Sequence, residues 1–136
     1  MELKWKLWFE KEGRRVIGKG GVEILKAIKE HGSISKASKA LGMSYRFVWN
    51  YLNEMERVLG ENVVERERGG REGGKTKLTR LGMELIEMFE RAERVIEKAL
   101  KFEEGVVEDV KDDVIVVRTK GSFRKGDRIL ILREDP

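Results

Sequence analysis

The chain has 136 residues, of which 40% are hydrophobic and 40% charged, so it can bury the core of one small domain and is not disordered by composition. No apolar run approaches the ~20 residues that span a bilayer, and the N-terminus lacks the apolar segment of a signal peptide, so we expect a cytoplasmic protein with no membrane partner. Cysteine is absent, which excludes disulfides and thiolate metal sites. Histidine occurs once, which argues against a histidine-based zinc site and a Ser-His relay. We therefore expect no metal site and no enzyme. Glutamine is also absent while Glu, Lys and Arg abound, which is typical of heat-adapted proteins.

The net charge of +4 is unevenly distributed along the chain. The first 80 residues carry +7 and the remaining residues carry −3. A basic first half favours a polyanionic partner. From charge alone, the alternative is an ordinary solvated surface of mixed charge.

The N-terminal segment has the pattern of a β-hairpin. Residues 3–10 alternate apolar and polar side chains, which predicts a strand with one buried face. Residues 11–14 are typical of a turn, and residues 15–18 predict a returning strand. We expect core packing for Trp5, whereas Trp8 falls on the other face and has no assigned role.

A helix is predicted over residues 20–31, because apolar residues from Val22 to Ile28 recur at helical spacing. Gly32 follows as a stop signal. His31 lies in the last turn of this helix, and we interpret it as part of the helix end rather than as a catalytic residue or a metal ligand.

Two further helices follow, separated by a short turn. Ser33 is a favourable N-cap for a helix over residues 34–41, and Ser44 is one for a helix over residues 45–59. Gly42 supplies the turn between them. A short helix, a glycine turn and a longer helix are the helix-turn-helix pattern. The expected buried stripe of the longer helix consists of Val48, Leu52, Met55 and Leu59.

A β-ribbon is predicted directly after the helix-turn-helix. Residues 62–66 and 76–78 predict strands, and residues 69–74 contain four glycines around an Arg-Glu pair. A ribbon in this place is a wing. Residues 66–80 carry a net charge of +4, which suits the phosphates beside a DNA groove.

A long helix is predicted over residues 80–104, with Thr79 as its cap. Its apolar stripe repeats at steps of three and four residues, close to the heptad spacing of helices that pack together. We expect the stripe to pack against a second copy, because so small a domain offers it little to cover. Packing back onto its own domain is the alternative. The stripe consists of Leu81, Leu85, Phe89, Ala92, Ile96 and Ala99.

The last segment predicts three short strands at residues 106–110, 114–117 and 129–132. Three strands in so few residues are marginal as an independent fold. We therefore expect them to pair with another element or with a second chain.

The helix over residues 45–59 carries, opposite its buried stripe, side chains that suit a major groove, since arginine pairs with guanine and asparagine with adenine. The start of the preceding helix suits phosphate contact, as do the wing cations. The candidate DNA-binding residues are Ser44, Tyr45, Arg46, Asn50 and Asn53 on the longer helix, Ser35 and Lys36 on the shorter one, and Arg66, Arg68, Arg71, Lys75 and Lys77 on the wing. Ordinary exposed polar positions are the alternative.

A competing pattern overlaps the wing. Gly69, Gly74, Lys75 and Thr76 satisfy the G-x-x-x-x-G-K-[ST] motif of a nucleotide-binding phosphate loop. That loop follows a buried parallel strand and opens directly into a helix. Here the preceding strand is mostly charged, and residues 75–78 predict a strand. We therefore favour a wing over nucleotide hydrolysis.

The helix-turn-helix and wing together resemble the N-terminal domain of the molybdate-responsive ModE regulators. The resemblance rests on residues 32–59 (GSISKASKALGMSYRFVWNYLNEMERVL), on glycine pairs at 69–70 and 73–74, and on LTRLG at 78–82, and it spans residues 3–100. LysR-type regulators, which share a winged helix followed by a dimerising helix, are similar more distantly. The resemblance implies a homodimer that binds double-stranded DNA, with Ser44, Tyr45 and Arg46 in recognition and wings on flanking DNA.

ModE regulators continue into small β-barrel modules that bind molybdate, and residues 105–136 are shorter than one such module. We therefore expect no cofactor. If an oxyanion such as molybdate acts as an effector, the candidates to bind it are Lys120, Ser122 and Lys125.

The predicted fold is α+β and mainly helical: a winged helix-turn-helix over residues 1–79, a long dimerisation helix over 80–104 and a short β segment over 105–136. We expect a sequence-specific, homodimeric transcriptional regulator. One alternative is a sequence-independent architectural DNA-binding protein. Another is a protein-interaction module whose C-terminal strands add to a partner's sheet. The C-terminal segment is also the place where we expect any small-molecule or protein partner to bind.

Overall fold

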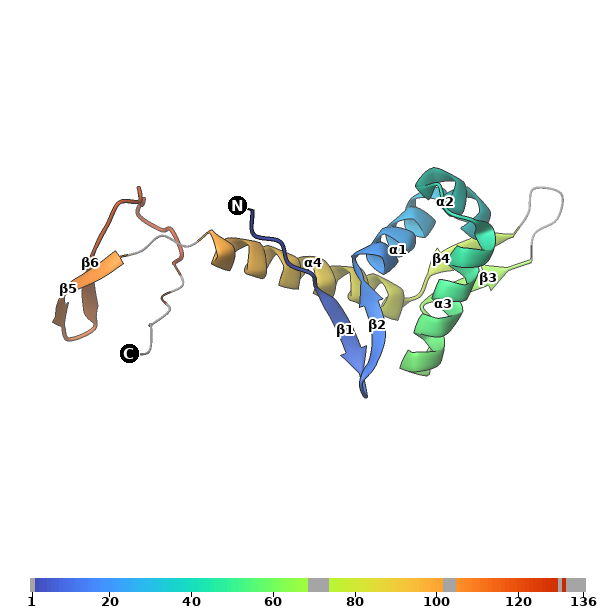
Figure 1. Cartoon of the computed structure of the whole chain (residues 1–136), viewed down its shortest axis with the longest axis horizontal. Helices are drawn as coiled ribbons and strands as arrows, with labels where there is room; N and C mark the ends of the chain where they lie inside the picture. The colour runs from blue at the N-terminus through green and yellow to red at the C-terminus, as the bar shows by residue number, and fades with distance from the viewer. Residues whose placement is uncertain (1, 69–73, 102–104, 130, 132–136) are drawn as a thin grey trace. The chain divides into compact units, whose positions relative to one another are not determined.

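The computed structural model describes residues 2–68, 74–101, 105–129 and 131, and the chain divides into two compact units, Met1–Glu97 and Lys98–Pro136. Figure 1 labels the elements in chain order. Within the described residues, the first unit holds four helices and two β-hairpins, and the second unit holds another hairpin. The predicted α+β class with a winged helix-turn-helix is confirmed. No helix in the described part is both long and apolar enough to cross a membrane.

The first hairpin pairs β1 (Trp8–Lys11) with β2 (Arg14–Gly18) in antiparallel orientation. Glu12 and Gly13 form its turn, and both have positive φ angles, 51° and 72°. Positive φ at both central residues gives the tight turn whose twist matches the paired strands. The hairpin is therefore confirmed, with a two-residue turn in place of the four-residue turn predicted.

The strand predicted over residues 3–10 is wrong for its first half. Trp8 pairs with Gly18, after which the chain enters a helix, so the residues before Trp8 have no partner strand there. Trp8 itself is 45% exposed. Its indole N–H donates to Glu10 at 2.8 Å, and the Arg15 guanidinium lies 5.7 Å from the ring centroid. Trp8 is therefore held by polar neighbours on the hairpin surface.

The first helix, α1 (Lys19–His31), begins one residue earlier than predicted. Gly21 lies in its first turn and is required there by packing, because a Cβ on it would come within 2.8 Å of the side chains of Ile17 and Tyr51. The helix ends at Gly32, which has a left-handed φ of 75°, as predicted.

The helix-turn-helix has the predicted bounds: α2 (Ile34–Leu41) and α3 (Tyr45–Leu59). Ser33 and Ser44 cap them, since each hydroxyl oxygen accepts a backbone N–H of the following turn at 3.1 Å. Gly42 makes the turn with a φ of 66°. The apolar core between the first three helices includes Val22, Ile24, Leu25, Ile28, Ile34, Ala37, Val48, Leu52 and Met55.

The wing consists of β3 (Val64–Glu67) and β4 (Lys75–Leu78), which pair in antiparallel orientation. Thr76 is buried, and its backbone N–H donates to the carbonyl oxygen of Gly32 at 2.8 Å. This bond attaches the wing to the end of α1. Both predicted strands are confirmed to within two residues at each end.

The fourth helix, α4 (Arg80–Leu100), begins where it was predicted to begin. The hydroxyl oxygen of Thr79 accepts the N–H of Gly82 at 3.1 Å and so caps the helix. The helix was predicted to continue to residue 104, but it ends at Leu100 and Lys101 is in a turn; residues 102–104 lie outside the described residues.

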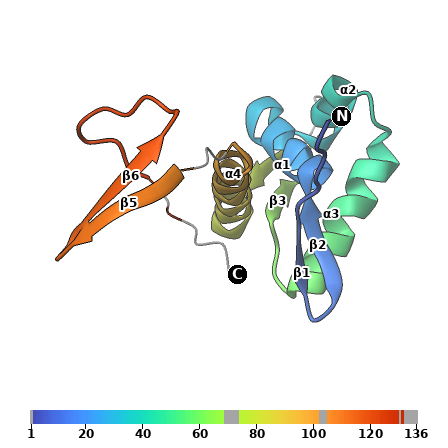
Figure 2. The ribbon, with the colours of Figure 1, turned by 60° about the vertical axis from the view of Figure 1, so that its left-hand side comes forward.

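The first half of the α4 stripe packs on its own domain. Leu85 and Phe89 are 5% and 1% exposed, and the Phe89 ring meets Phe9 of β1 edge to face with centroids 5.9 Å apart. A Cβ on Gly82 would collide with the carbonyl oxygen of Val63, so glycine allows α4 to lie against the chain there. Figure 2 looks nearly along α4, with α1 and β3 beside it. The expectation that the stripe finds little to cover is wrong for this half, because the hairpin supplies a surface.

The second unit contains one described hairpin, β5 (Gly105–Lys111) paired with β6 (Val114–Thr119) in antiparallel orientation, with a register shift between Val107 and Asp109. Its pairing brings four β-branched side chains to one face, while the other face mixes charged residues with Val106, Val114 and Val116. The apolar face consists of Val107, Val110, Ile115 and Val117, which are 37–62% exposed.

The third strand predicted for residues 129–132 is wrong where it can be examined. Ile129 and Ile131 have no strand conformation, and their neighbours at 130 and 132 lie outside the described residues. A strand forms only with a hydrogen-bonded neighbour, and β5 and β6 pair with each other. An apolar run by itself does not supply that partner.

Candidate nucleic-acid interface

The outward face of α3 carries most of the predicted base-reading residues. Tyr45 is 51% exposed, and Arg46, Asn50 and Asn53 are exposed as well. The Tyr45 ring stacks on Trp49 with an interplanar angle of 15° and centroids 6.1 Å apart. The first turn of α3 therefore presents an aromatic side chain and a guanidinium on one surface.

The charged side chains Glu54 and Arg57 in the last part of α3 neutralise each other. The Arg57 guanidinium donates to both carboxylate oxygens of Glu54, at 2.9 and 2.5 Å. This hydrogen bond lowers the pKa of the Glu54 carboxyl. The groove chemistry of the helix is thus concentrated at its N-terminal end.

A cluster of polar groups joins α3 to the wing. The Glu56 carboxylate accepts the backbone N–H groups of Val63 and Val64 at 3.0 and 3.2 Å, and it accepts the Arg66 guanidinium at 3.1 Å. These bonds satisfy two donors at the start of β3 and fix the strand to the helix. Glu56 is therefore the residue that sets the wing against α3.

Arg66 and Asn53 contact each other in this cluster. The guanidinium donates to the Asn53 carbonyl oxygen at 3.1 Å, and it lies over the Trp49 ring at 4.5 Å from the centroid. Both residues were predicted to contact DNA. Their intramolecular bonds were not predicted, and a DNA contact by either one stays a prediction.

The wing strands expose further cations. Arg68, Lys75 and Lys77 are exposed, and Lys77 lies 3.7 Å from Glu65 across the strands. Arg71, also predicted to bind DNA, lies outside the described residues. Ser35 and Lys36 are exposed at the start of α2.

The nucleotide-binding hypothesis does not fit this geometry. A phosphate loop opens into a helix, whereas Lys75 and Thr76 begin strand β4. Strand β4 pairs with β3 in an antiparallel two-stranded ribbon rather than in a parallel sheet. Gly69 of the motif and the four variable positions 70–73 lie outside the described residues.

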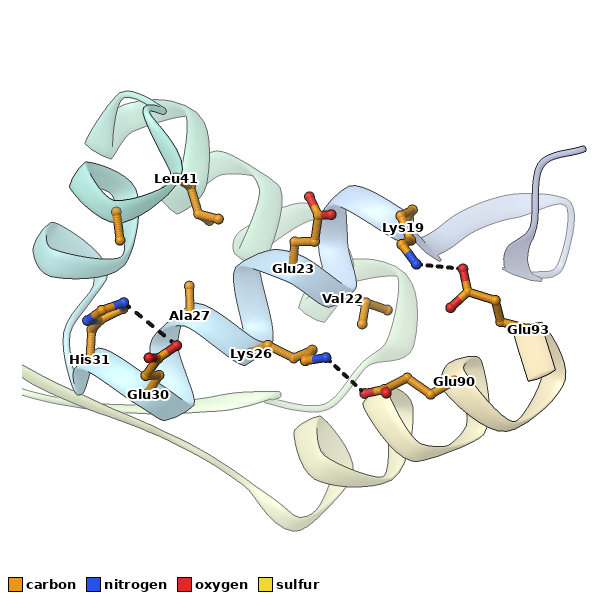
Figure 3. A pocket seen from close by; sticks show the side chains of 11 residues that line it. Lys19, Val22, Glu23, Lys26, Ala27, Glu30, His31, Leu41, Glu90 and Glu93 are labelled. Carbon is orange, nitrogen blue, oxygen red and sulfur yellow. Dashed lines mark hydrogen bonds and ion pairs between the residues drawn. The ribbon is translucent and has the colours of Figure 1, made fainter. Parts of the chain in front are cut away.

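Two lysines of the basic first half pair with acidic residues of α4. Figure 3 shows Lys19 bonded to Glu93 and Lys26 beside Glu90. The nitrogen–oxygen distances are 2.6 and 3.4 Å. The four residues line a groove of about 500 Å³ between α1, α2 and α4. The bond to Glu93 raises the pKa of the Lys19 ammonium. The positive charge of these lysines is therefore offset inside the domain. No group of three or more His, Cys, Asp or Glu among the described residues could hold a metal ion.

The oxyanion candidates lie after β6. Lys120, Ser122 and Lys125 are all exposed. The groove of Figure 3 and a second, apolar groove on α4 are lined by other residues. An oxyanion site at these three residues stays a prediction.

The predicted dimerisation residues divide into two sets. Leu85 and Phe89 are buried in the core, and Leu81 packs against it. Ala92 and Ile96 instead line the apolar groove of about 380 Å³ together with Phe9, Met88, Arg91 and Val95. Ala99 is half-buried. Dimerisation through Ala92, Ile96 and Ala99 stays a prediction, whereas Leu85 and Phe89 are covered by their own domain.

Sequence reasoning missed two residues of the interface. Phe47 is 52% exposed in the first turn of α3. Its position directly before the buried Val48 could have placed it outside the core, since neighbours are 100° apart on a helix. Glu56 gives no such signal, because its partners are backbone groups of a strand that follows in the chain.

Comparison with known proteins supports this geometry. Residues 21–83 match the model of the bacterial regulatory helix-turn-helix protein, lysR family. These residues form a LysR-type helix-turn-helix domain. The transcriptional regulator ModE of Yersinia pestis is 38% identical over 78 residues, which cover 57% of this chain and 30% of that protein.

Two further proteins also match over more than half of this chain. The molybdenum-pterin-binding protein MopA of Rhodobacter capsulatus is 33% identical over 101 residues, which cover 74% of this chain and 38% of MopA. The crystal structure of ArgP from Mycobacterium tuberculosis matches with a TM-score of 0.45 and 22% identity, over 59% of this chain and 28% of that one. The chain thus spans about a third of the length of the curated relatives it matches.

Proposed function

We propose that this chain is a homodimeric DNA-binding transcriptional regulator of the ModE type. In this proposal α3 lies in the major groove, and strands β3 and β4 lie against flanking phosphates. The observation that supports it best is the exposed first turn of α3 beside the exposed cations of the wing, within a LysR-type helix-turn-helix domain. Such a role places the chain in the cytoplasm.

The proposal assigns different roles to the two surfaces. Arg46 and Asn50 read bases, because their side chains make bidentate pairs with guanine and adenine in a major groove. Lys75 and Lys77 neutralise phosphates, which contributes affinity without sequence preference. Arg66 holds the wing against α3 through Glu56.

The test is binding of the full chain to a fragment selected from its source genome and to a random duplex, over a range of salt. Arg46→Ala should lose discrimination at one base position, by about 1–3 kcal/mol. Lys75→Ala should weaken binding to both duplexes equally and reduce the salt slope by about 0.9. If both variants shifted both duplexes alike, the assignment of roles would be wrong.

The same assay separates a regulator from an architectural protein. A regulator retains a defined fragment in competition with genomic DNA at about 200 mM salt, whereas a sequence-independent binder releases all fragments alike. Two recognition helices related by a two-fold axis should protect half-sites about one DNA turn, ~34–36 Å, or a multiple apart.

The proposed dimer uses the exposed side of α4. Met88 and Val95 are 55% and 57% exposed and border the apolar groove that Ala92 and Ile96 line. Met88, Ala92, Val95 and Ala99 follow at steps of four, three and four residues, which is heptad spacing. Two copies of such a stripe cover each other when the helices pack side by side.

Sedimentation of paired variants tests this surface. Val95→Glu places a charge in the seam and should give a monomer at micromolar concentration. Arg94→Glu introduces the same side chain at the neighbouring exposed position and should leave the dimer intact. A wild-type chain that sediments as a monomer would overturn the dimer.

A further inference from the structure

An exposed phenylalanine lies where the proposed interface would meet the bases. Phe47 is 52% exposed in the first turn of α3, between Arg46 and the buried Val48. Its backbone N–H donates to the hydroxyl oxygen of the N-cap residue Ser44 at 3.1 Å, which fixes its backbone in the first turn. A large apolar side chain at this position is exposed without any role in the core.

The Phe47 ring packs against the ring of Tyr51, one helical turn later. Its centroid lies 6.2 Å from that of Tyr51, with an interplanar angle of 49°. Tyr51 is half-buried, and its ring fills the space that Gly21 of α1 leaves open. The Phe47 ring therefore lies next to Tyr51 while about half of the side chain stays exposed.

A major groove offers few apolar partners to such a ring. The bases present hydrogen-bonding groups there, and the apolar feature is the C5-methyl group of thymine. We propose that Phe47 reads thymine by packing its ring on this methyl group, beside the base pair that Arg46 contacts. This inference rests on the proposed function, since it needs α3 in the groove.

The experiment removes the methyl group alone. In a duplex that the full chain retains, each thymine is replaced in turn by 2′-deoxyuridine, which keeps all base pairing. At one or two positions in each half-site the replacement should weaken wild-type binding about fourfold, the factor expected for one buried methyl group. Other positions should show no change.

Protein variants then locate the contact. Phe47→Ala should bind the thymine and uracil duplexes equally, and Phe47→Leu should keep part of the difference because it stays apolar. Met83→Ala, at a similarly exposed apolar residue on α4 outside the proposed interface, should keep the wild-type difference. Thermal unfolding of each variant checks that it is folded.

The outcomes are separable. If no fragment is retained over random DNA, the proposed function fails and this inference fails with it. If a fragment is retained but no thymine methyl affects binding, or if Phe47→Ala keeps the uracil penalty, the proposed function stands and thymine reading by Phe47 is overturned. If Phe47→Ala loses self-association instead, the ring belongs to a protein contact and the inference is likewise overturned.

Discussion

The two units of the chain differ in whether their apolar side chains are buried or exposed. In the first unit, residues such as Phe89, Leu52 and Ile28 are at most 1% exposed and belong to one apolar core. In the second unit, the four β-branched residues that share one face of β5 and β6 are 37–62% exposed. The difference follows from geometry: helices and hairpins of the first unit cover one another, whereas a two-stranded hairpin has no second layer of its own.

The strongest test of this comparison uses two adjacent residues of α4. Phe89→Ala should lower the free energy of unfolding by about 3–5 kcal/mol, because it removes a ring from a packed core. Met88→Ala, one position away and 55% exposed, should change it by less than about 0.5 kcal/mol in the monomer. Urea unfolding followed by circular dichroism measures both. Equal, small losses would show that α4 is not part of this core.

A second test uses two glycines of the first unit. Gly82→Ala should cost about 1–3 kcal/mol, because the new Cβ collides with the Val63 carbonyl oxygen and α4 must move away. Gly20→Ala meets no atom within 4 Å and should stabilise α1 by about 0.5–1 kcal/mol through helix propensity. Thermal unfolding of the two variants gives the comparison. A neutral Gly82→Ala would mean that α4 and the segment before β3 are not in close contact.

Features set by neighbouring residues could be predicted from the sequence, and features set by distant contacts could not. The bounds of α2 and α3 were predicted to the residue, because Ser33, Gly42 and Ser44 are local signals that act within one helical turn. The inward direction of Phe89 was not predicted. It depends on Phe9, eighty residues earlier, and the α4 pattern alone does not show which surface covers it.

The candidate site follows the same rule. The exposure of Tyr45, Arg46 and Asn50 was predicted from the helical period of their own segment. The bonds of Arg66 to Glu56 and Asn53 were not, because they join two elements whose relative placement appears only in the folded chain. Charge and exposure of a residue can be predicted locally, while its partner often cannot.

A smaller effect is expected at the ion pair between α1 and α4. Lys19 and Glu93 lie 2.6 Å apart, and the lysine side chain is 62% exposed, so solvent screens the pair and its coupling should be about 0.2–1 kcal/mol. The bond raises the pKa of Lys19. A raised lysine pKa contributes stability that is fully present below the unfolded value of about 10.4 and is lost as the pH rises through the folded value.

A double-mutant cycle measures this coupling. Lys19→Met and Glu93→Gln, alone and together, give the interaction energy at neutral pH and again above the lysine pKa. The coupling should vanish at the higher pH. The exposed pair Lys77 and Glu65, 3.7 Å apart, serves as a weaker reference. A coupling that persisted in the alkaline range would show that the charge of Lys19 is not its source.

The smallest change in the free energy of unfolding is expected for substitutions on the exposed apolar face of β5. Val107→Thr combined with Val110→Thr keeps two β-branched side chains in β5 and replaces apolar by polar surface. Because these side chains are 53% and 62% exposed, the free energy of unfolding should change by less than about 0.5 kcal/mol. A loss above 1 kcal/mol, measured by urea unfolding at several protein concentrations, would show that the face is covered in solution. Its dependence on concentration would then separate cover by a second copy, which weakens on dilution, from cover within one chain, which does not.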